Sequence, residues 1–505
     1  MTASPAEPAG RITAWLFAEL PVVVPEWLPS QRWFGGKARA IDRVEVEDVL
    51  WLSGEPTCCA LVVVEVRYAE AGAPDSRARE RYAMIVGMRS DARGSSTIGR
   101  VEWQPELRAV EAGADGPAVL ALLRGFVSGE PVRGARAGLL TYADATRATR
   151  QTVAPDGEPP AVAPVGPEQS NTSVRLGFSH VFKLFRRLED GENPQLEIGR
   201  FLAKTNFRSA PTLEGSLTYR APDGRSATLA LLENWIVNGG DGWSYVVTRL
   251  QQAAREGSGL EALAPDMFRL GSTTADFHAA LASDPNSTAF APEPVTSADV
   301  QAWRAGLLAQ ADRAMALIER HHAQWSSEAA DMGRALLRRR VDLAQRFPGV
   351  DLGPGKAFQK IRVHGDYHLG QTLKTADGFA LIDFEGEPAT SLEDRRQKHC
   401  ALKDVAGMVR SLEYAAQTVI DRTAAAPGAR LSVTGLREAF VKGYLARAMA
   451  GRVTFLPSSP DSVASWIGFF ELEKALYEVE YEVNNRPAWV HIPLRGVMQI
   501  LQGRE

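Results

Sequence analysis

Residues 361–388 read IRVHGDYHLGQTLKTADGFALIDFEGEP, and this stretch decides the fold. Two runs in it, residues 371–374 and 379–384, have the apolar content of short strands. Between them, residues 376–378 form a turn signal that ends in a glycine, the residue that most easily adopts positive φ. The stretch therefore predicts a β-hairpin, and it lies inside a part of the chain whose other patterns are helical.

Three polar side chains surround this hairpin. Asp366 precedes it, Gln371 lies at its mouth five residues later, and Asp383 lies near the end of its second strand. Phosphoryl transfer needs such a set, because a carboxylate accepts the proton of the acceptor hydroxyl while oxygen ligands hold magnesium ions on the phosphates. The spacing matches that of the base and the two metal ligands in kinases. We predict Asp366 as the catalytic residue and Gln371 and Asp383 as magnesium ligands.

A zinc site is the competing interpretation of the same loop. His364 and His368 frame Asp366 in a His-x-Asp-x-His pattern, which could ligate zinc in a metallohydrolase. The sequence has no second His or Cys cluster that would close such a site, so zinc is disfavoured. We expect His364 to fix the loop by hydrogen bonding.

Composition excludes several classes of function. The chain has 505 residues with a net charge of −4 and no long block of one sign, which argues against nucleic-acid and membrane-surface roles. Its cysteines, Cys58, Cys59 and Cys400, cannot form a disulfide framework. No apolar run is long enough to span a bilayer. We expect a cytoplasmic protein, with a monomer favoured.

The order of predicted elements gives the architecture. Residues 58–68 and 81–88 predict strands of a small α+β unit near the N-terminus, and the proline-rich residues 153–167 break the chain. After this break come a predicted helix and four strands, at residues 195–203 and at residues 172–176, 181–185, 212–219 and 228–235. Long helical patterns follow from residue 244, interrupted by the hairpin.

A strand-rich lobe followed by a helical lobe with an inserted hairpin is the order of a kinase-like fold. We predict an α+β, bilobal fold of the protein-kinase type with an N-terminal cap. The predicted domains are a cap at residues 1–115, a strand-rich nucleotide-binding lobe at 116–235, and a helical lobe at 236–505 that carries the hairpin.

Several motifs resemble one known family. The run His364-Gly365-Asp366 with a downstream Ile-Asp-Phe resembles the aminoglycoside phosphotransferases. Five further segments resemble the actinobacterial maltokinases and their glucosamine kinase relatives: DFEGEP at 383–388, DVAGM at 404–408, LEKALYE at 472–478, NNRP at 484–487, and QRWF at 31–34 in the predicted cap. Residues 394–399, DRRQKH, are more basic than is expected of a maltokinase.

The resemblance implies that ATP and Mg²⁺ bind in a cleft between the lobes. Lys183, in a predicted strand, and Glu197, on the following helix, resemble the lysine–glutamate ion pair of kinases. Polar residues at the preceding strand would cover the phosphates, and the end of the last strand would bind adenine. The remaining predicted nucleotide contacts are Ser170, Asn171, Thr172, Ser173, Glu233 and Trp235.

The predicted C-terminal helix, residues 469–484, carries an apolar stripe flanked by carboxylates and tyrosines. A solvated acidic face is one interpretation, and a sugar site is the other, because aromatic rings stack on sugars and carboxylates bind hydroxyls or an ammonium group. The predicted substrate contacts are Asp366, His368, Asp404, Glu471, Tyr477, Glu478, Tyr481 and Glu482.

These observations predict an ATP-dependent kinase of a small sugar. Glucosamine, giving glucosamine 6-phosphate, is the favoured acceptor, since a buried ammonium group needs carboxylate partners. The alternative acceptor is maltose, giving maltose 1-phosphate. A nucleotide-binding pseudokinase scaffold is the alternative of another class, and the intact Asp366 and Asp383 argue against it. Small sugar and ATP are the expected partners, with no nucleic acid and no membrane.

Overall fold

The computed structural model describes residues 6–53, 58–69, 79–90, 96–153, 158–166, 170–256, 258–339, 358–423 and 433–502. The chain divides into two compact units. The first comprises residues 1–200 and 211–235, and the second comprises residues 201–210 and 236–505.

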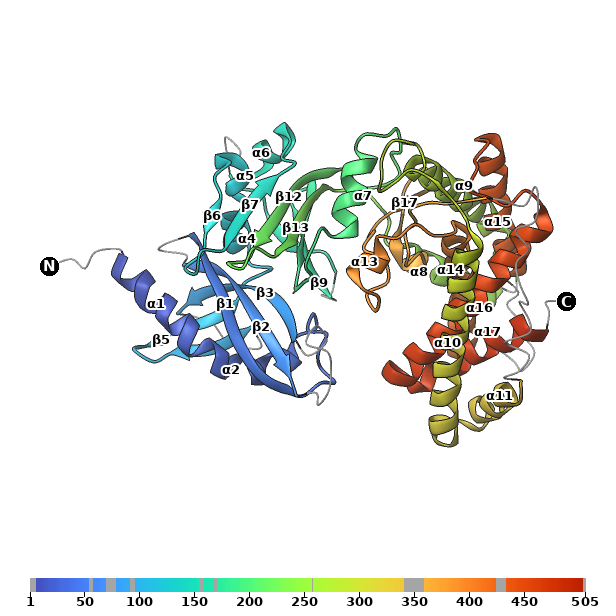
Figure 1. Ribbon diagram of the computed structural model, residues 1–505, viewed down its shortest axis with the longest axis horizontal. Coiled ribbons are helices and arrows are strands. Elements are labelled where there is room, and N and C mark those ends of the chain that lie inside the picture. The colour runs from blue at the N-terminus through green and yellow to red at the C-terminus, as the bar shows by residue number, and fades with distance from the viewer. Residues whose placement is uncertain are drawn as a thin grey trace. The chain divides into compact units, whose positions relative to one another are not determined.

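An antiparallel sheet forms the N-terminal part of the first unit, in the order β1-β2-β3-β5-β4. Helices α1 (Ala6–Ala18) and α2 (Leu20–Trp27) share a core with one of its faces (Figure 1). The strands are β1 (Ile41–Ser53), β2 (Cys59–Tyr68), β3 (Arg79–Arg89), β4 (Thr97–Val101) and β5 (Gln104–Glu111). The α+β class predicted for this region is confirmed, with a larger sheet than the two predicted strands.

The sequence of strand β2 does not alternate between apolar and polar residues, because both faces of this strand are buried. Val62 and Val64 pack with α1 and α2, whereas Leu61 and Val63 pack into a second core on the opposite face. A strand that is buried on both faces has no polar side, and its sequence reads as a continuous apolar run.

That second core is shared with a second sheet, of order β6-β7-β12-β13-β10-β9-β8. Its helices are α4 (Gly116–Leu123), α5 (Gly125–Ser128), α6 (Arg147–Val153) and α7 (Pro194–Leu202). Its strands are β6 (Val132–Arg133), β7 (Leu139–Ala143), β8 (Val162–Pro164), β9 (Asn171–Leu176), β10 (His180–Phe185), β12 (Leu213–Arg220) and β13 (Ser226–Asn234). The short β11 (Arg187–Leu188) pairs with β3 and so belongs to the first sheet.

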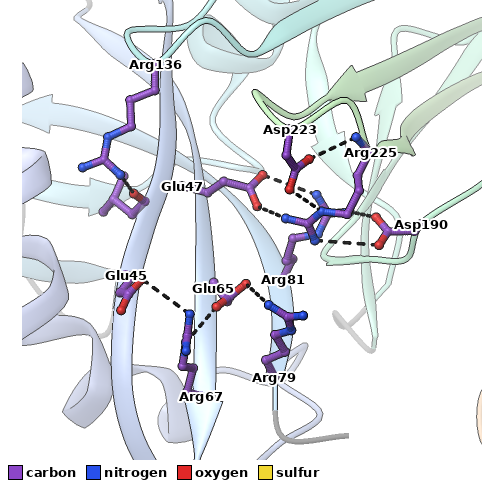
Figure 2. A network of polar contacts seen from close by, with 11 residues as sticks. Glu45, Glu47, Glu65, Arg67, Arg79, Arg81, Arg136, Asp190, Asp223 and Arg225 are labelled. Carbon is purple, nitrogen blue, oxygen red and sulfur yellow. Dashed lines mark hydrogen bonds and ion pairs between the residues drawn. The ribbon is translucent and has the colours of Figure 1, made fainter. Parts of the chain in front are cut away.

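Ion pairs join the two sheets of the first unit (Figure 2). The buried Arg81 of β3 pairs with Glu47 of β1 and with Asp190, which precedes α7. Arg225, in the turn between β12 and β13, reaches Glu47 at 3.2 Å and Asp223 at 2.6 Å. Arginine is suited to such bridges because its planar guanidinium presents several donors at once.

The second unit is helical, with a small hairpin of β16 (Thr372–Lys374) and β17 (Phe379–Leu381) and a second strand pair, β14 (Glu293–Pro294) and β15 (Gln359–Lys360). Its α-helices are α8 (Gly242–Glu256), α9 (Ala264–Leu281), α10 (Ser297–His321), α11 (Ser327–Arg338), α13 (Leu392–Arg395), α14 (Leu402–Thr423), α15 (Thr434–Ala450), α16 (Pro460–Asn485) and α17 (His491–Gln502). Within the described ranges, no helix is long and apolar enough to cross a membrane.

The predicted hairpin is present, but its second strand ends at Leu381 rather than at Phe384. Asp383 has φ of +67°, and this left-handed backbone ends the extended run.

Asp48 of β1 gives a test of how the two sheets are joined. Its fully buried carboxylate accepts hydrogen bonds from the backbone N–H groups of Val49, Arg136 and Gly138, at 2.8, 2.8 and 2.7 Å. D48N places an amide NH₂ against these donors, so we expect a loss of about 1–3 kcal/mol in the free energy of unfolding. Urea unfolding measures this free energy, with D42N at an exposed position of the same strand as the control. An equal loss in D48N and D42N would contradict the role of Asp48 in joining the two sheets.

Candidate active site

The loop that carries Asp366 is held by its backbone. The N–H groups of His364 and Gly365 donate to the two carboxylate oxygens of Asp404, at 2.7 and 3.0 Å. Gly365 has φ of +85°, a conformation that residues with a Cβ rarely adopt. The loop therefore turns sharply at the residue before Asp366, and both adjacent amides are fixed.

Asp404 lies in the first turn of α14 and is buried. His278 of α9 donates from Nε2 to its Oδ2 at 2.9 Å, and the hydroxyl of Tyr444 lies 2.9 Å from Nδ1 of His278. Burial would raise the pKa of Asp404, but the His278 bond and the loop amides outweigh it, so the pKa lies below its ordinary value. These contacts make Asp404 the anchor of the loop, and its predicted role as a substrate contact stays a prediction.

Hydrogen bonds also tie this loop to the hairpin. His364 donates from Nε2 to the carbonyl oxygen of Ile382 at 2.9 Å, which is the loop-fixing role expected of it. The N–H of Ile382 donates to the carbonyl oxygen of Gln371 at 3.0 Å, so β17 leads back beside the start of β16. The His364–Ile382 hydrogen bond thus connects the loop that carries Asp366 to the end of the hairpin, next to Asp383.

Gln371 and Asp383 fit the metal role by their chemistry. Both supply oxygen ligands, which Mg²⁺ prefers, and both are half-buried. Asp383 is a non-glycine residue with positive φ, a strained state typical of functional sites. Among the described residues, no three His, Cys, Asp or Glu side chains gather into a metal site. A pair of protein ligands completed by phosphate oxygens would not require one.

A lysine pairs with the predicted catalytic carboxylate. Lys474 of α16 donates from Nζ to Oδ1 of Asp366 at 3.0 Å, and it lies 3.9 Å from Oε1 of Glu387. Burial would raise the pKa of Asp366, but the Lys474 ammonium outweighs it and the pKa lies below its ordinary value. The pKa of Lys474 is raised by Asp366 and Glu387, against the effect of burial.

His368 and Glu387 complete this charged cluster. The N–H of Gly370 donates to Nδ1 of His368 at 3.1 Å, and Nε2 lies 3.9 Å from Oδ2 of Asp366. Burial lowers the pKa of His368 and raises that of Glu387, with Lys474 opposing the rise at Glu387. The cluster therefore holds a neutral imidazole beside an ionised Asp366.

Most of the carboxylates predicted to bind the sugar form ion pairs with arginines of the protein. Glu471 pairs with Arg437 at 2.8 Å and Glu478 with Arg410 at 2.6 Å. Glu482 accepts a hydrogen bond of 2.6 Å from the Tyr414 hydroxyl and pairs with Arg486. These contacts stabilise the packing of α16, and they do not support the predicted substrate role of Glu471, Glu478 and Glu482.

The two tyrosines of α16 have different surroundings. The ring of Tyr477 lies 4.6 Å from Nζ of Lys474, whereas Tyr481 is exposed. The sequence pattern predicted Tyr477 as a substrate contact, whereas Lys474 and Glu387 were not predicted. The signal was available, because Lys474 is three residues before Tyr477 on a helix, a spacing that puts two side chains on one face.

In the first unit, a chain of hydrogen bonds links the predicted nucleotide contacts. Lys183 of β10 donates to Oε1 of Gln195 at 2.8 Å, and Gln195 donates from Nε2 to Oε1 of Glu233 at 3.0 Å. Glu197 is buried on the same helix, α7. Gln195 was not predicted, and the Lys183–Glu197 pair stays a prediction.

The other predicted nucleotide contacts lie on β9 and after β13. Ser170 is exposed, Asn171 and Ser173 are half-buried, and the buried Thr172 hydroxyl accepts a hydrogen bond from Nε of Arg186 at 2.7 Å. The N–H of Trp235 donates to the carbonyl oxygen of Ser179 at 2.7 Å. The hydroxyl of Thr172 is thus engaged in a hydrogen bond within the protein.

The chain is similar to one family model and to two glucosamine kinases. Residues 27–115 match the family model of the maltokinase N-terminal cap domain. A glucosamine kinase from Mycolicibacterium smegmatis is 27% identical over 65% of this chain and 77% of its own length. A glucosamine kinase from Streptacidiphilus jiangxiensis is 28% identical over 67% of this chain and 73% of its own length.

Solved structures agree in fold. One glucosamine kinase crystal form superposes with a TM-score of 0.63 over 97% of this chain and 99% of that chain, at 21% identity. A glucosamine kinase in complex with glucosamine, ADP and inorganic phosphate superposes with a TM-score of 0.59 over 91% of this chain and 94% of that chain, at 21% identity. The predicted fold class is confirmed.

The anchoring role of Asp404 predicts a pH-dependent loss of stability in D404N. Removing this buried charge leaves two amides and His278 poorly matched, so we expect a cost of about 3 kcal/mol in unfolding free energy at pH 7. Because the pKa of Asp404 is lowered by folding, its contribution is complete above the ordinary carboxyl pKa and is lost as pH falls below it.

The difference between wild type and D404N should therefore shrink as the pH falls below about 4. Urea unfolding at several pH values measures it, with D377N in the exposed hairpin turn as the control. A difference that stays constant with pH, or one no larger than that of D377N, would contradict the anchoring role.

Proposed function

We propose that this chain belongs to the maltokinase and glucosamine kinase family and transfers the γ-phosphate of ATP to a hydroxyl of glucosamine. The observation that carries the proposal is the state of Asp366. Its carboxylate is held on a loop with fixed amides, is paired with Lys474 and has a lowered pKa. An ionised, positioned carboxylate is what a kinase needs beside an acceptor hydroxyl.

Asp366 acts on the acceptor hydroxyl. Its free oxygen lone pairs accept a hydrogen bond from that hydroxyl, which orients the oxygen toward the γ-phosphorus. The proton passes to the Asp366 carboxylate as the new O–P bond forms and the bond between the γ-phosphorus and the ADP oxygen breaks. Lys474 keeps the carboxylate ionised before the transfer and fixes its rotamer.

Gln371 and Asp383 would hold Mg²⁺, which neutralises charge on the phosphate oxygens. Support comes from their oxygen ligands and from the strained backbone of Asp383. For the nucleotide, Lys183 is the proposed phosphate contact, with Gln195 and Glu233 fixing its position. Ser170, Asn171, Ser173 and Trp235 remain proposed side-chain contacts, whereas the Thr172 hydroxyl accepts its hydrogen bond from Arg186.

The proposed acceptor contacts are centred on Glu387. This carboxylate shares Lys474 with Asp366, and its pKa is raised mainly by burial, so a cationic partner would stabilise its charged form. An amino sugar brings such a partner. Tyr477 and His368 offer an aromatic face and a polar ring nitrogen beside the same lysine.

The similarity of this chain to two relatives that are named glucosamine kinases favours glucosamine over maltose as the acceptor. One observation favours the second candidate: the cap matches a domain that is named for maltokinases. Both candidates use the same Asp366 chemistry, and they differ in the sugar and in the hydroxyl that is phosphorylated.

A sugar panel tests this proposal. With Mg²⁺ and ATP held constant, kcat/KM should be highest for glucosamine and much lower for glucose, N-acetylglucosamine and maltose, because these lack the ammonium group. D366N should lower kcat roughly 10²–10⁴-fold while ATP affinity stays near that of wild type. Efficient turnover of maltose with little for glucosamine would restore the maltokinase alternative, and normal turnover by folded D366N would remove Asp366 as the base.

The ion pair between Lys474 and Asp366 predicts that the pH dependence of kcat/KM shifts when Lys474 is replaced. In K474M the charge that lowers the pKa of Asp366 is gone, so burial dominates and the pKa rises. The acidic limb of kcat/KM should therefore move to higher pH than in wild type, since the base becomes protonated earlier as pH falls. K474R keeps the charge and should restore the wild-type limb. An unchanged acidic limb in K474M would show that Lys474 does not control the ionisation of Asp366.

A further inference from the structure

The strand that carries Lys183 continues directly into the cap sheet. β10 ends at Phe185, and β11 begins two residues later, where Arg187 pairs with Tyr82 and Leu188 with Arg81 of β3. Between them, the carbonyl oxygen of Arg186 accepts a hydrogen bond of 2.8 Å from the N–H of Ala83. The backbone that leaves the predicted nucleotide strand is therefore an edge strand of the cap.

The Arg186 side chain is enclosed by cap residues. It is fully buried, and its Nη1 donates to Glu111 at 2.7 Å and to the carbonyl oxygen of Ala83 at 3.4 Å. The guanidinium carbon lies 4.9 Å from the ring centroid of Trp33. A Cβ on Gly113 would come within 2.2 Å of Nη2, so a larger residue there would displace the guanidinium from this position.

Arg186 also reaches into the second sheet. Its Nε donates to Oγ1 of Thr172 on β9 at 2.7 Å. Thr172 is paired with Leu184 of β10, and the next pair along the ladder is Ser173 with Lys183. One buried side chain therefore connects the cap to the strand pair that carries Lys183 and the predicted phosphate contacts.

The cap holds the far end of the same segment as well. Asp190, just before α7, pairs with Arg81 of β3 and with Arg225 (Figure 2). Helix α7 then supplies Gln195, which accepts the hydrogen bond from Lys183. Both the start and the end of the connection from β10 to α7 are thus fixed by cap contacts.

We propose that Arg186 is a positioning residue through which the cap sets the geometry of the nucleotide site. A buried guanidinium must keep its charged and hydrogen-bonding partners, so its position follows Glu111 and Trp33 of the cap. Through Thr172 and the β10 backbone, that position is passed to Lys183. This role gives the cap a part in binding ATP, and it rests on the proposed kinase function.

The test uses the full-length protein and measures both substrates. E111Q removes the charge of the cap partner, and T172V removes the hydroxyl while keeping the side-chain shape. In each variant we expect the Kd for ADP, by calorimetry, and the KM for ATP to rise roughly 3- to 30-fold. The KM for glucosamine should stay at the wild-type value. T172S, which keeps the hydroxyl, should restore ADP affinity.

D48N is the matched control. Asp48 is another buried cap carboxylate, and its backbone partners lie on β1 and in the β6–β7 connection rather than near Arg186. It should lower the melting temperature without raising the Kd for ADP. A merely stabilising role of Arg186 predicts that E111Q, T172V and D48N behave alike.

The outcomes separate this proposal from the function. Unchanged ADP affinity and unchanged KM for ATP in folded T172V overturn the positioning role, and this variant decides the matter if E111Q does not fold. Wild-type protein that binds ADP but phosphorylates no sugar contradicts the proposed function, whereas weaker ADP binding by T172V with recovery in T172S would still support Arg186.

Discussion

Two backbone amides and one imidazole converge on the buried carboxylate of Asp404, and the loop that carries Asp366 depends on this interaction. A buried carboxylate is stable only when its oxygens accept hydrogen bonds, so the amides of His364 and Gly365 cannot move without a large cost. Because Asp366 is the next residue, its position is set from α14 and α9 rather than from the flexible surface of a loop.

The charges around Asp366 follow from the same constraint. Once the backbone is fixed, Lys474 of α16 meets the carboxylate at 3.0 Å and lowers its pKa against the effect of burial. Glu387 shares that lysine, and its pKa is raised. Two carboxylates with opposite shifts beside one ammonium group can serve as a base and as a binding group for a cation.

The sequence predicted the kinase-like fold, the hairpin and the strand with Lys183, because each is encoded by local patterns of a few residues. The substrate contacts predicted on α16 stay predictions. Glu471, Glu478 and Glu482 were chosen for their charge, and their arginine partners lie far away in sequence or on a neighbouring turn. Lys474 and Arg186 contact residues on distant segments of the chain, and such contacts leave no local sequence pattern.

The identity of the product tests the proposed phosphorylation of glucosamine. Wild-type protein would be incubated with Mg²⁺, ATP and ¹³C-labelled glucosamine, and the site of phosphorylation read from carbon–phosphorus coupling by NMR. We expect coupling at C6, the signature of glucosamine 6-phosphate, with one ADP formed for each sugar phosphorylated. Coupling at C1, or ATP consumption without any phosphorylated glucosamine, would contradict it.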